Sequence, residues 1–131
     1  MLNAEEFVRL RQSDRSEDYL RAANESAEKE VWLDIIQRFP EMRVWVAHNK
    51  TVPLEILAIL ARDEDPAVRS FVAMKNKLSS ELFGLLARDR DSSVRERIAY
   101  NKNTPLEVLR VLTEDPNEAI ASRAHQRLSR L

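Results

Sequence analysis

The stretch DEDPAVRSFVA, residues 63–73, is followed twenty-six positions later by DRDSSVRERIA, residues 89–99. Both begin with Asp, place an Arg six residues further on and end in Ala. Three longer segments align without a gap at the same spacing: RVWVAHNKTVPLEILAILARDEDPAV, RSFVAMKNKLSSELFGLLARDRDSSV and RERIAYNKNTPLEVLRVLTEDPNEAI, which begin at residues 43, 69 and 95. Similarity at one fixed spacing over this length indicates an internal structural repeat.

Each repeat carries the signals of two short helices. In the first helix, Val68, Phe71 and Val72 lie three and four residues apart, which is the spacing of one helical face. Asp65 before Pro66 predicts that this helix begins at the proline, capped by the carboxylate. The asparagines that follow the first helix are expected to end it in the left-handed conformation; these are Asn49 and Asn101.

The second helix of the repeat is predicted from the segment NTPLEVL. Thr104 is expected to cap it, with Pro105 in the first helical position and Glu107 three residues beyond the cap. Leucine and valine over residues 106–112 occupy most of its circumference, so we expect this helix to be the more buried of the pair.

Such short helix pairs cannot bury their apolar faces alone, whereas stacked pairs can. We therefore predict an all-α chain folded as an α-solenoid of stacked two-helix repeats, with a 26-residue period and polar terminal capping helices. One domain is expected over residues 1–131. Its parts are an N-terminal cap with a divergent first repeat over 1–38, three regular repeats over 39–116 and a C-terminal cap helix over 117–131.

The pattern VRxxVAxN…TPLEVLxxLxxD resembles the leucine-rich-repeat variant, a bacterial relative of the HEAT-like α-helical repeats. The phrases AVRSFVAMKN, SVRERIAYNKNTPLEVLRVL and RVWVAHNKTVPLEILAILARDEDP carry the resemblance, which covers about two-thirds of the chain. It implies stacked short helices, some of them 3₁₀, in a curved solenoid. Some members hold an iron–sulfur cluster with cysteines. This chain has none, so that function is not transferred and no cofactor is expected.

The resemblance also implies a structural role for the repeated Asp and Arg. In HEAT-like repeats an aspartate in the turn and an arginine on the following helix form a ladder between units. A guanidinium can bond a carboxylate bidentately while it satisfies main-chain groups near a helix start. The residues assigned to this ladder are Arg43, Asp63, Arg69, Asp89 and Arg95.

Composition and charge limit the possible functions. The chain has 44% apolar and 33% charged residues, one glycine and no cysteine, with 21 basic and 22 acidic residues. These values are typical of a helical globular protein without disulfides or thiolate metal sites. Residues 43–102 hold eleven basic and eight acidic residues behind an acidic N-terminal segment. No stretch has the character of a signal peptide or a membrane span, so a cytoplasmic protein without membrane contact is expected.

Groups suited to catalysis or metal binding are few. His48 and His125 lie in different repeats at non-equivalent positions, and neither has a second ligand at helical or turn spacing. A single glycine cannot form a phosphate-binding loop. Ser79, Ser92 and Thr104 are interpreted as helix caps rather than nucleophiles. We therefore expect a protein that is not an enzyme and holds no metal.

Three columns of equivalent repeat positions vary in residue type. The first column holds Trp45, Phe71, Arg97 and Arg123. The second holds His48, Met74 and Tyr100. The third holds Lys50, Asn76 and Lys102, joined by Lys75 and Lys77. Equivalent positions of stacked repeats lie in a line, so the second and third columns are expected to form an edge of apolar, aromatic and basic side chains.

Two interpretations of these columns remain open. Core packing is favoured for Trp45 and Phe71, and a solvated loop edge for the other two columns. The alternative is a protein-binding strip, because tryptophan, tyrosine, methionine and arginine are enriched at binding hot spots. Trp32 fits either interpretation. The residues assigned to the strip are His48, Met74, Tyr100, Lys50, Lys102 and Trp45.

These observations favour a non-catalytic module that binds another protein as a scaffold, adaptor or inhibitory partner. The alternative is a HEAT-like solenoid that binds nucleic acid through a basic edge. The residues of that edge would be Lys50, Lys75, Lys77, Arg97 and Lys102. The balanced total charge weighs against this alternative, because binding along a phosphate backbone requires a sustained positive face.

Overall fold

The computed structural model describes residues 1–131, and the chain is all-helical, as predicted. Ten α-helices and one 3₁₀ helix follow one another, and the single β-bridge pairs Leu2 with Ala27. The chain divides into two compact units, Met1–Leu60 and Ala61–Leu131. None of the helices has both the length and the apolar character needed to cross a bilayer.

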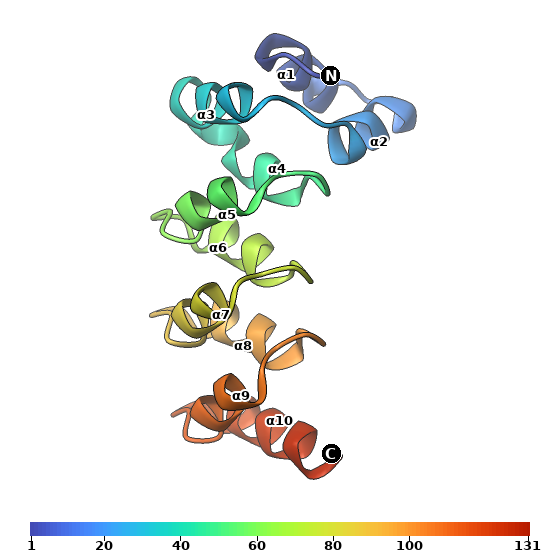
Figure 1. Ribbon diagram of the computed structural model, residues 1–131. Coiled ribbons are helices and arrows are strands. Elements are labelled where there is room, and N and C mark those ends of the chain that lie inside the picture. The colour runs from blue at the N-terminus through green and yellow to red at the C-terminus, as the bar shows by residue number, and fades with distance from the viewer. The chain divides into compact units, whose positions relative to one another are not determined.

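The first unit contains five α-helices and the 3₁₀ helix (Figure 1). They are α1 (Ala4–Gln12), α2 (Ser16–Asn24), α3 (Lys29–Arg38), η1 (Pro40–Met42), α4 (Arg43–His48) and α5 (Leu54–Leu60). Phe7 of α1 and Trp32 of α3 are fully buried, and their rings meet edge to face with centroids 5.5 Å apart. Trp32 is therefore a core residue, which decides between the two interpretations left open for it.

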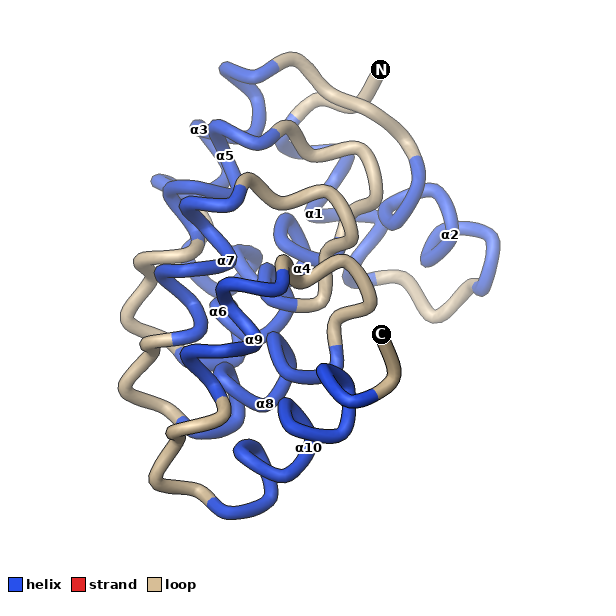
Figure 2. Tube along the Cα trace, turned by 60° about the horizontal axis from the view of Figure 1, so that its bottom comes forward, coloured by secondary structure: helices blue, strands red, loops and turns tan.

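The second unit contains α6 (Pro66–Ala73), α7 (Ser80–Ala87), α8 (Ser92–Tyr100), α9 (Leu106–Leu112) and α10 (Glu118–Ser129). The first helices of successive repeats pack on one another, α6 on α8 and α8 on α10, while α7 packs on α9. The loops of this unit lie along two opposite edges (Figure 2). We call the turns that contain Asp63, Asp89 and Asp115 the aspartate edge. The loops over residues 74–79 and 100–105 are called the Tyr100 edge.

Small and branched apolar side chains fill the interior of the second unit. Ala73 and Ala99 are fully buried, and their size lets the next helix approach closely. The second helices are less buried than the sequence predicted, because Leu106 and Val111 of α9 are exposed. The surrounding core consists of Val68, Val72, Leu82, Phe83, Leu86, Val94, Ile98, Val108, Leu109, Leu112, Ile120 and Ala124.

Local capping chemistry sets where three of these helices begin. Asp65 and Asp91 accept hydrogen bonds from the amides two residues on, and Ser79 accepts one from the Leu82 amide at 3.1 Å. These caps confirm the prediction. The prediction for Thr104 is wrong, because its hydroxyl donates to the buried carbonyl of Ile98 at 2.7 Å and Pro105 occupies the cap position of α9.

We expect Ser79→Ala to lower the free energy of unfolding by about 1 kcal/mol, because the Leu82 amide loses its hydrogen-bond acceptor. Urea denaturation followed by circular dichroism measures the change. Ser80→Ala is the matched control, since Ser80 is the first helical residue and makes no capping bond. Equal stability of the two variants would contradict the assignment of Ser79 as the cap.

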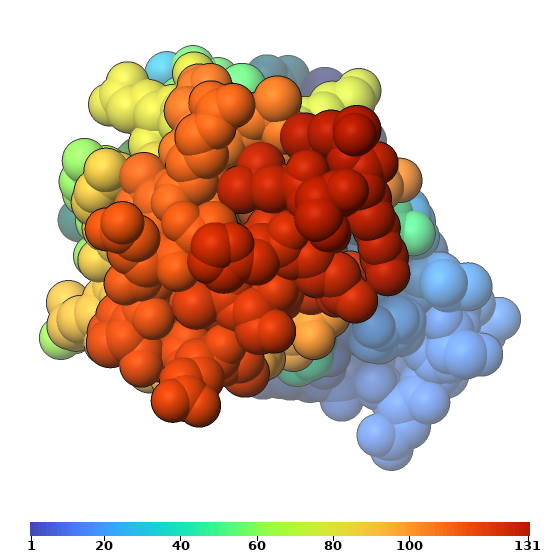
Figure 3. All heavy atoms as spheres, turned by 90° about the horizontal axis from the view of Figure 1, so that it is seen from below, coloured from blue at the N-terminus to red at the C-terminus, as the bar shows by residue number.

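The last helix departs from the repeat in ways that suit a terminal position. On α10, Ala121 stands where the earlier repeats have Arg95, and exposed His125 stands where they have the buried Ala99. Helix α10 and the C-terminal turn cover much of the face seen in Figure 3, beside residues of α9. The exposed residues of this helix are mainly polar or charged.

Candidate functional site

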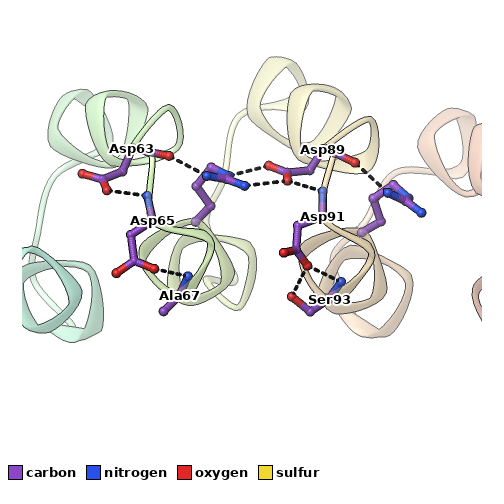
Figure 4. Close-up of polar contacts among 8 residues, drawn as sticks. Asp63, Asp65, Ala67, Asp89, Asp91 and Ser93 are labelled. Atoms are coloured by element: carbon purple, nitrogen blue, oxygen red, sulfur yellow. Dashed lines mark hydrogen bonds and ion pairs between the residues drawn. The ribbon is translucent and has the colours of Figure 1, made fainter.

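The repeated Asp and Arg meet at the aspartate edge of the second unit (Figure 4). The guanidinium of Arg69 donates to the main-chain carbonyl of Asp63 at 2.6 Å and to both carboxylate oxygens of Asp89 at 2.8 and 3.1 Å. The side chains of Arg69 and Asp89 are only 4% and 8% exposed. The hydrogen bond to Asp89 raises the pKa of Arg69 above its ordinary value.

The next repeat makes the same contacts. Arg95 donates to the carbonyl of Asp89 at 2.8 Å and to the carboxylate of Asp115 at 2.8 and 3.3 Å. The aspartate six residues before each arginine therefore supplies a main-chain carbonyl. The carboxylate partner lies twenty residues after the arginine, in the turn before the next first helix. In the first unit, Arg43 donates through Nε to the carbonyl of Ile36 at 2.9 Å.

A second set of contacts fastens the repeats at the Tyr100 edge. The side-chain amide of Asn101 donates to the carbonyls of Ala73 and Lys75 at 2.9 and 2.7 Å, and its oxygen accepts from the Asn103 amide at 3.0 Å. Asn101 is only 7% exposed and has φ −67° and ψ 120°. The predicted left-handed cap is therefore wrong, because the side chain instead satisfies buried carbonyls of the preceding repeat.

Equivalent positions repeat this contact. In the first unit, Asn49 donates to the carbonyls of Ala22 and Glu25 at 2.8 and 3.0 Å, again without a left-handed backbone. On α10, Arg127 donates to the carbonyls of Ala99 and Asn101 at 2.9 and 2.7 Å. This role was not predicted from the sequence. Its signal was a donor-bearing residue at every position of one 26-residue column: Asn49, Lys75, Asn101 and Arg127.

The contacts of Asn101 lie beside two large exposed side chains of the Tyr100 edge, one from each of two adjacent repeats. Met74 lies between the two carbonyls that Asn101 bonds, and Tyr100 directly precedes the asparagine. Met74 is 50% exposed and Tyr100 is 58% exposed. The side-chain amide of Asn103 also donates to the carbonyl of Asn76 at 2.8 Å. Hydrogen bonds therefore connect the loops of adjacent repeats close to Met74 and Tyr100.

Basic residues lie in or next to the loops that carry Met74 and Tyr100. Lys77, Arg97 and Lys102 are exposed, whereas Lys75 is half-buried. The guanidinium of Arg123 lies over the ring of Tyr100, 4.5 Å from its centroid, at a distance where a cation attracts the face of an aromatic ring. The Tyr100 edge thus presents an apolar and aromatic centre with a cationic rim.

The first unit has its own aromatic cluster at the end of α4. The rings of Trp45 and His48 lie 5.7 Å apart, and those of Tyr19 and His48 lie 5.8 Å apart. Arg11 lies over the ring of Trp45 at 3.6 Å and over that of Tyr19 at 4.9 Å. Partial burial lowers the pKa of Arg11 from its ordinary value. Lys50 is exposed in the following loop.

The favoured interpretation of Trp45 and Phe71 as core residues is wrong, because both side chains are half-buried and neither belongs to the buried core. Trp45 is the base of the aromatic cluster, covered on one face by Arg11. His125 is exposed on α10. No group of three or more histidine, cysteine, aspartate or glutamate side chains is arranged to hold a metal ion.

Comparison of the chain with protein-family models, with curated proteins and with solved structures finds no match.

Proposed function

We propose that this chain is a non-catalytic helical-repeat module that binds another protein through the Tyr100 edge and the aromatic cluster of Trp45 and His48. The observation that supports the proposal most directly is the exposure of Met74 and Tyr100 on loops whose backbone is held by Asn101. Large, half-exposed apolar side chains on rigid backbone lose little conformational freedom when a partner covers them.

The residue types at these positions support a protein partner. Tyrosine, tryptophan and arginine dominate binding hot spots, and methionine adapts its shape to irregular apolar surfaces. Met74 and Tyr100 supply apolar anchors in the second unit, with Lys102 at their rim. Trp45 supplies an aromatic anchor in the first unit, with Lys50 in the following loop. Rim charges of this kind raise association rates and select partners more than they add affinity.

The finer architecture is part of the same proposal. We propose an α-solenoid of stacked repeats, similar to the leucine-rich-repeat variant and HEAT-like repeats. The packing of α6, α8 and α10 in the second unit supports it, as do the repeated contacts of Arg69 and Arg95. Each repeat of such a stack needs only its neighbours for stability, which frees the loop edges for binding.

The proposal includes no catalytic step. Several carboxylates that would be candidates for acid–base chemistry already have structural partners. Asp65 and Asp91 cap helices, and Asp89 and Asp115 bond guanidinium groups at the aspartate edge. A carboxylate whose oxygens are both occupied by a bidentate arginine is poorly placed to reach a substrate.

We expect the triple variant His48→Ala/Met74→Ala/Tyr100→Ala to lose its protein partner in a pull-down. The bait is the purified full-length chain, and the lysate of the encoding organism is treated with nuclease. Truncation of several hot-spot residues should reduce the recovered partner by at least about tenfold, because each anchor contributes a large share of the binding free energy.

The matched control is Ile59→Ala/Val111→Ala, which removes two exposed apolar side chains from second helices. Equal helicity of all three proteins, measured by circular dichroism, shows that folding is retained. Equal loss of the partner in the control and the triple variant would contradict the proposed surface. Recovery of nucleic acid alone, before nuclease treatment, would favour the nucleic-acid-binding alternative.

A further inference from the structure

Basic and acidic residues are distributed unevenly within Ala61–Leu131. The C-terminal halves of α6, α8 and α10, with the loops or turn that follow them, span residues 70–80, 97–106 and 122–131. These segments contain seven basic residues and no acidic residue. The rest of the unit contains six basic and eleven acidic residues. The seven basic residues are Lys75, Lys77, Arg97, Lys102, Arg123, Arg127 and Arg130.

Two ion pairs of this unit lie at the opposite edge. Arg69 pairs with Asp89, and Arg95 pairs with Asp115, both at the aspartate edge. Lys77, Arg97 and Lys102 are exposed and make no ion pair. The acidic residues nearest to the Tyr100 edge in the sequence are Glu81 and Glu107, exposed in the first turns of α7 and α9.

Two guanidinium groups of α10 stand close to Tyr100 without a carboxylate. Arg123 lies over the tyrosine ring, and its Nε is buried without a hydrogen-bond partner. Arg127 bonds only main-chain carbonyls. Burial lowers the pKa of Arg127, and the neighbouring charge of Arg123 lowers it further. A carboxylate brought by a partner would offset the repulsion between these two cations.

We infer that the Tyr100 edge binds an extended acidic segment of a partner protein, with an apolar side chain of that segment seated against Met74 and Tyr100. The inference rests on the proposed function and adds the chemistry of the partner. Its carboxylates would meet Lys77, Lys102 and the guanidinium groups of α10, while its apolar residue would cover the exposed methionine and tyrosine.

The distance between the axes of stacked helices sets the interval at which residues of the partner segment should meet successive repeats. Helices packed side by side have axes about 8–10 Å apart. An extended chain in the polyproline II conformation advances about 3.1 Å per residue and presents every third side chain on the same face. A segment that runs along the edge therefore brings about every third residue to the next repeat, so carboxylates and apolar residues are expected to recur at that interval.

Nucleic acid is the less favourable occupant of this edge. Phosphate backbones require a positive face that is sustained over several contacts. Glu81 and Glu107 follow the basic loops by two residues, in the first turns of α7 and α9, and add negative charge next to them. Met74 also places an apolar, non-stacking side chain at the centre of the edge, where single-stranded binding uses aromatic platforms. An acidic segment with an apolar residue matches both features.

The test is selection of random dodecapeptides displayed on phage against the full-length chain, followed by fluorescence anisotropy with the synthesised peptides. We expect enriched sequences to be acidic, with an apolar residue and carboxylates about every third position. Charge reversal in Lys77→Glu/Lys102→Glu should weaken binding by about tenfold or more, and added salt should weaken binding to the wild type. Met74→Ala should weaken it through loss of the apolar contact.

Arg90→Glu/Arg110→Glu is the matched control, because it changes the net charge equally at exposed positions away from the Tyr100 edge. It should bind the peptides within about twofold of the wild type. Enrichment of neutral or basic peptides that still require Met74 would overturn this inference and leave the proposed function standing. Failure to select any peptide would also overturn it. Competition of the selected peptides by a single-stranded oligonucleotide at the same edge would overturn both proposals.

Discussion

The Arg69→Met variant should lose about 3–5 kcal/mol of unfolding free energy, the largest effect that we expect from a single substitution. Arg69 supplies three hydrogen bonds at the aspartate edge, two to the carboxylate of Asp89 and one to the carbonyl of Asp63. Methionine retains much of the apolar stem but leaves the nearly buried carboxylate without a counter-charge. Urea denaturation followed by circular dichroism measures the loss.

Two further variants test whether the loss of stability comes from the unpaired carboxylate of Asp89 or from removal of an arginine side chain in general. Arg90→Met removes an exposed arginine from the turn before α8 and should change stability by less than about 0.5 kcal/mol. Arg69→Met/Asp89→Leu removes both charges and should recover most of the loss, because no uncompensated carboxylate remains. If Arg69→Met were no more destabilising than Arg90→Met, the ion pair at the aspartate edge would have no role in stability.

The second large effect is expected for Asn101→Ala, at about 3 kcal/mol. The substitution leaves the carbonyls of Ala73 and Lys75 and the amide of Asn103 without their partners. Each buried polar group that loses its hydrogen bond costs about 1–3 kcal/mol, less where water can enter. Asn101→Asp should be similarly destabilising, since a carboxylate cannot donate to two carbonyls.

Asn103→Ala is the matched control for this site. It removes one exposed hydrogen bond, from the Asn103 side chain to the Asn76 carbonyl, and should cost no more than about 1 kcal/mol. Thermal unfolding and amide hydrogen exchange of the loop over residues 74–79 report the difference. Equal destabilisation by Asn101→Ala and Asn103→Ala would contradict the role of Asn101 in fastening adjacent repeats.

Local chemistry made much of the fold predictable. The 26-residue spacing predicted short helices in the right places, and the caps at Asp65, Ser79 and Asp91 depend only on residues two or three positions away. Predictions for Asn101 and Thr104 failed because their partners are buried carbonyls presented by tertiary packing and by the preceding helix. Local propensity carries no information about such partners.

The repeat column that holds Met74 and Tyr100 could be predicted, but the contacts around it could not. In the structure both side chains are exposed, and Asn101 bonds the carbonyls on either side of Met74. The stacking of Arg123 on Tyr100 and of Arg11 on Trp45 depends on how separate helices pack. A periodic pattern identifies which face a residue occupies, whereas these contacts depend on distances between helices that the pattern does not contain.

The most direct test of the proposed function is photo-crosslinking from the Tyr100 edge. A photoreactive benzoylphenylalanine replaces Tyr100 in one protein and the exposed Val111 in another, and both are irradiated in nuclease-treated lysate. We expect a protein adduct from position 100 and none from position 111. The adduct from position 100 should be lost when Lys77→Glu/Lys102→Glu is added. No adduct from position 100, with an adduct from position 111, would contradict the assignment of the Tyr100 edge as the binding surface.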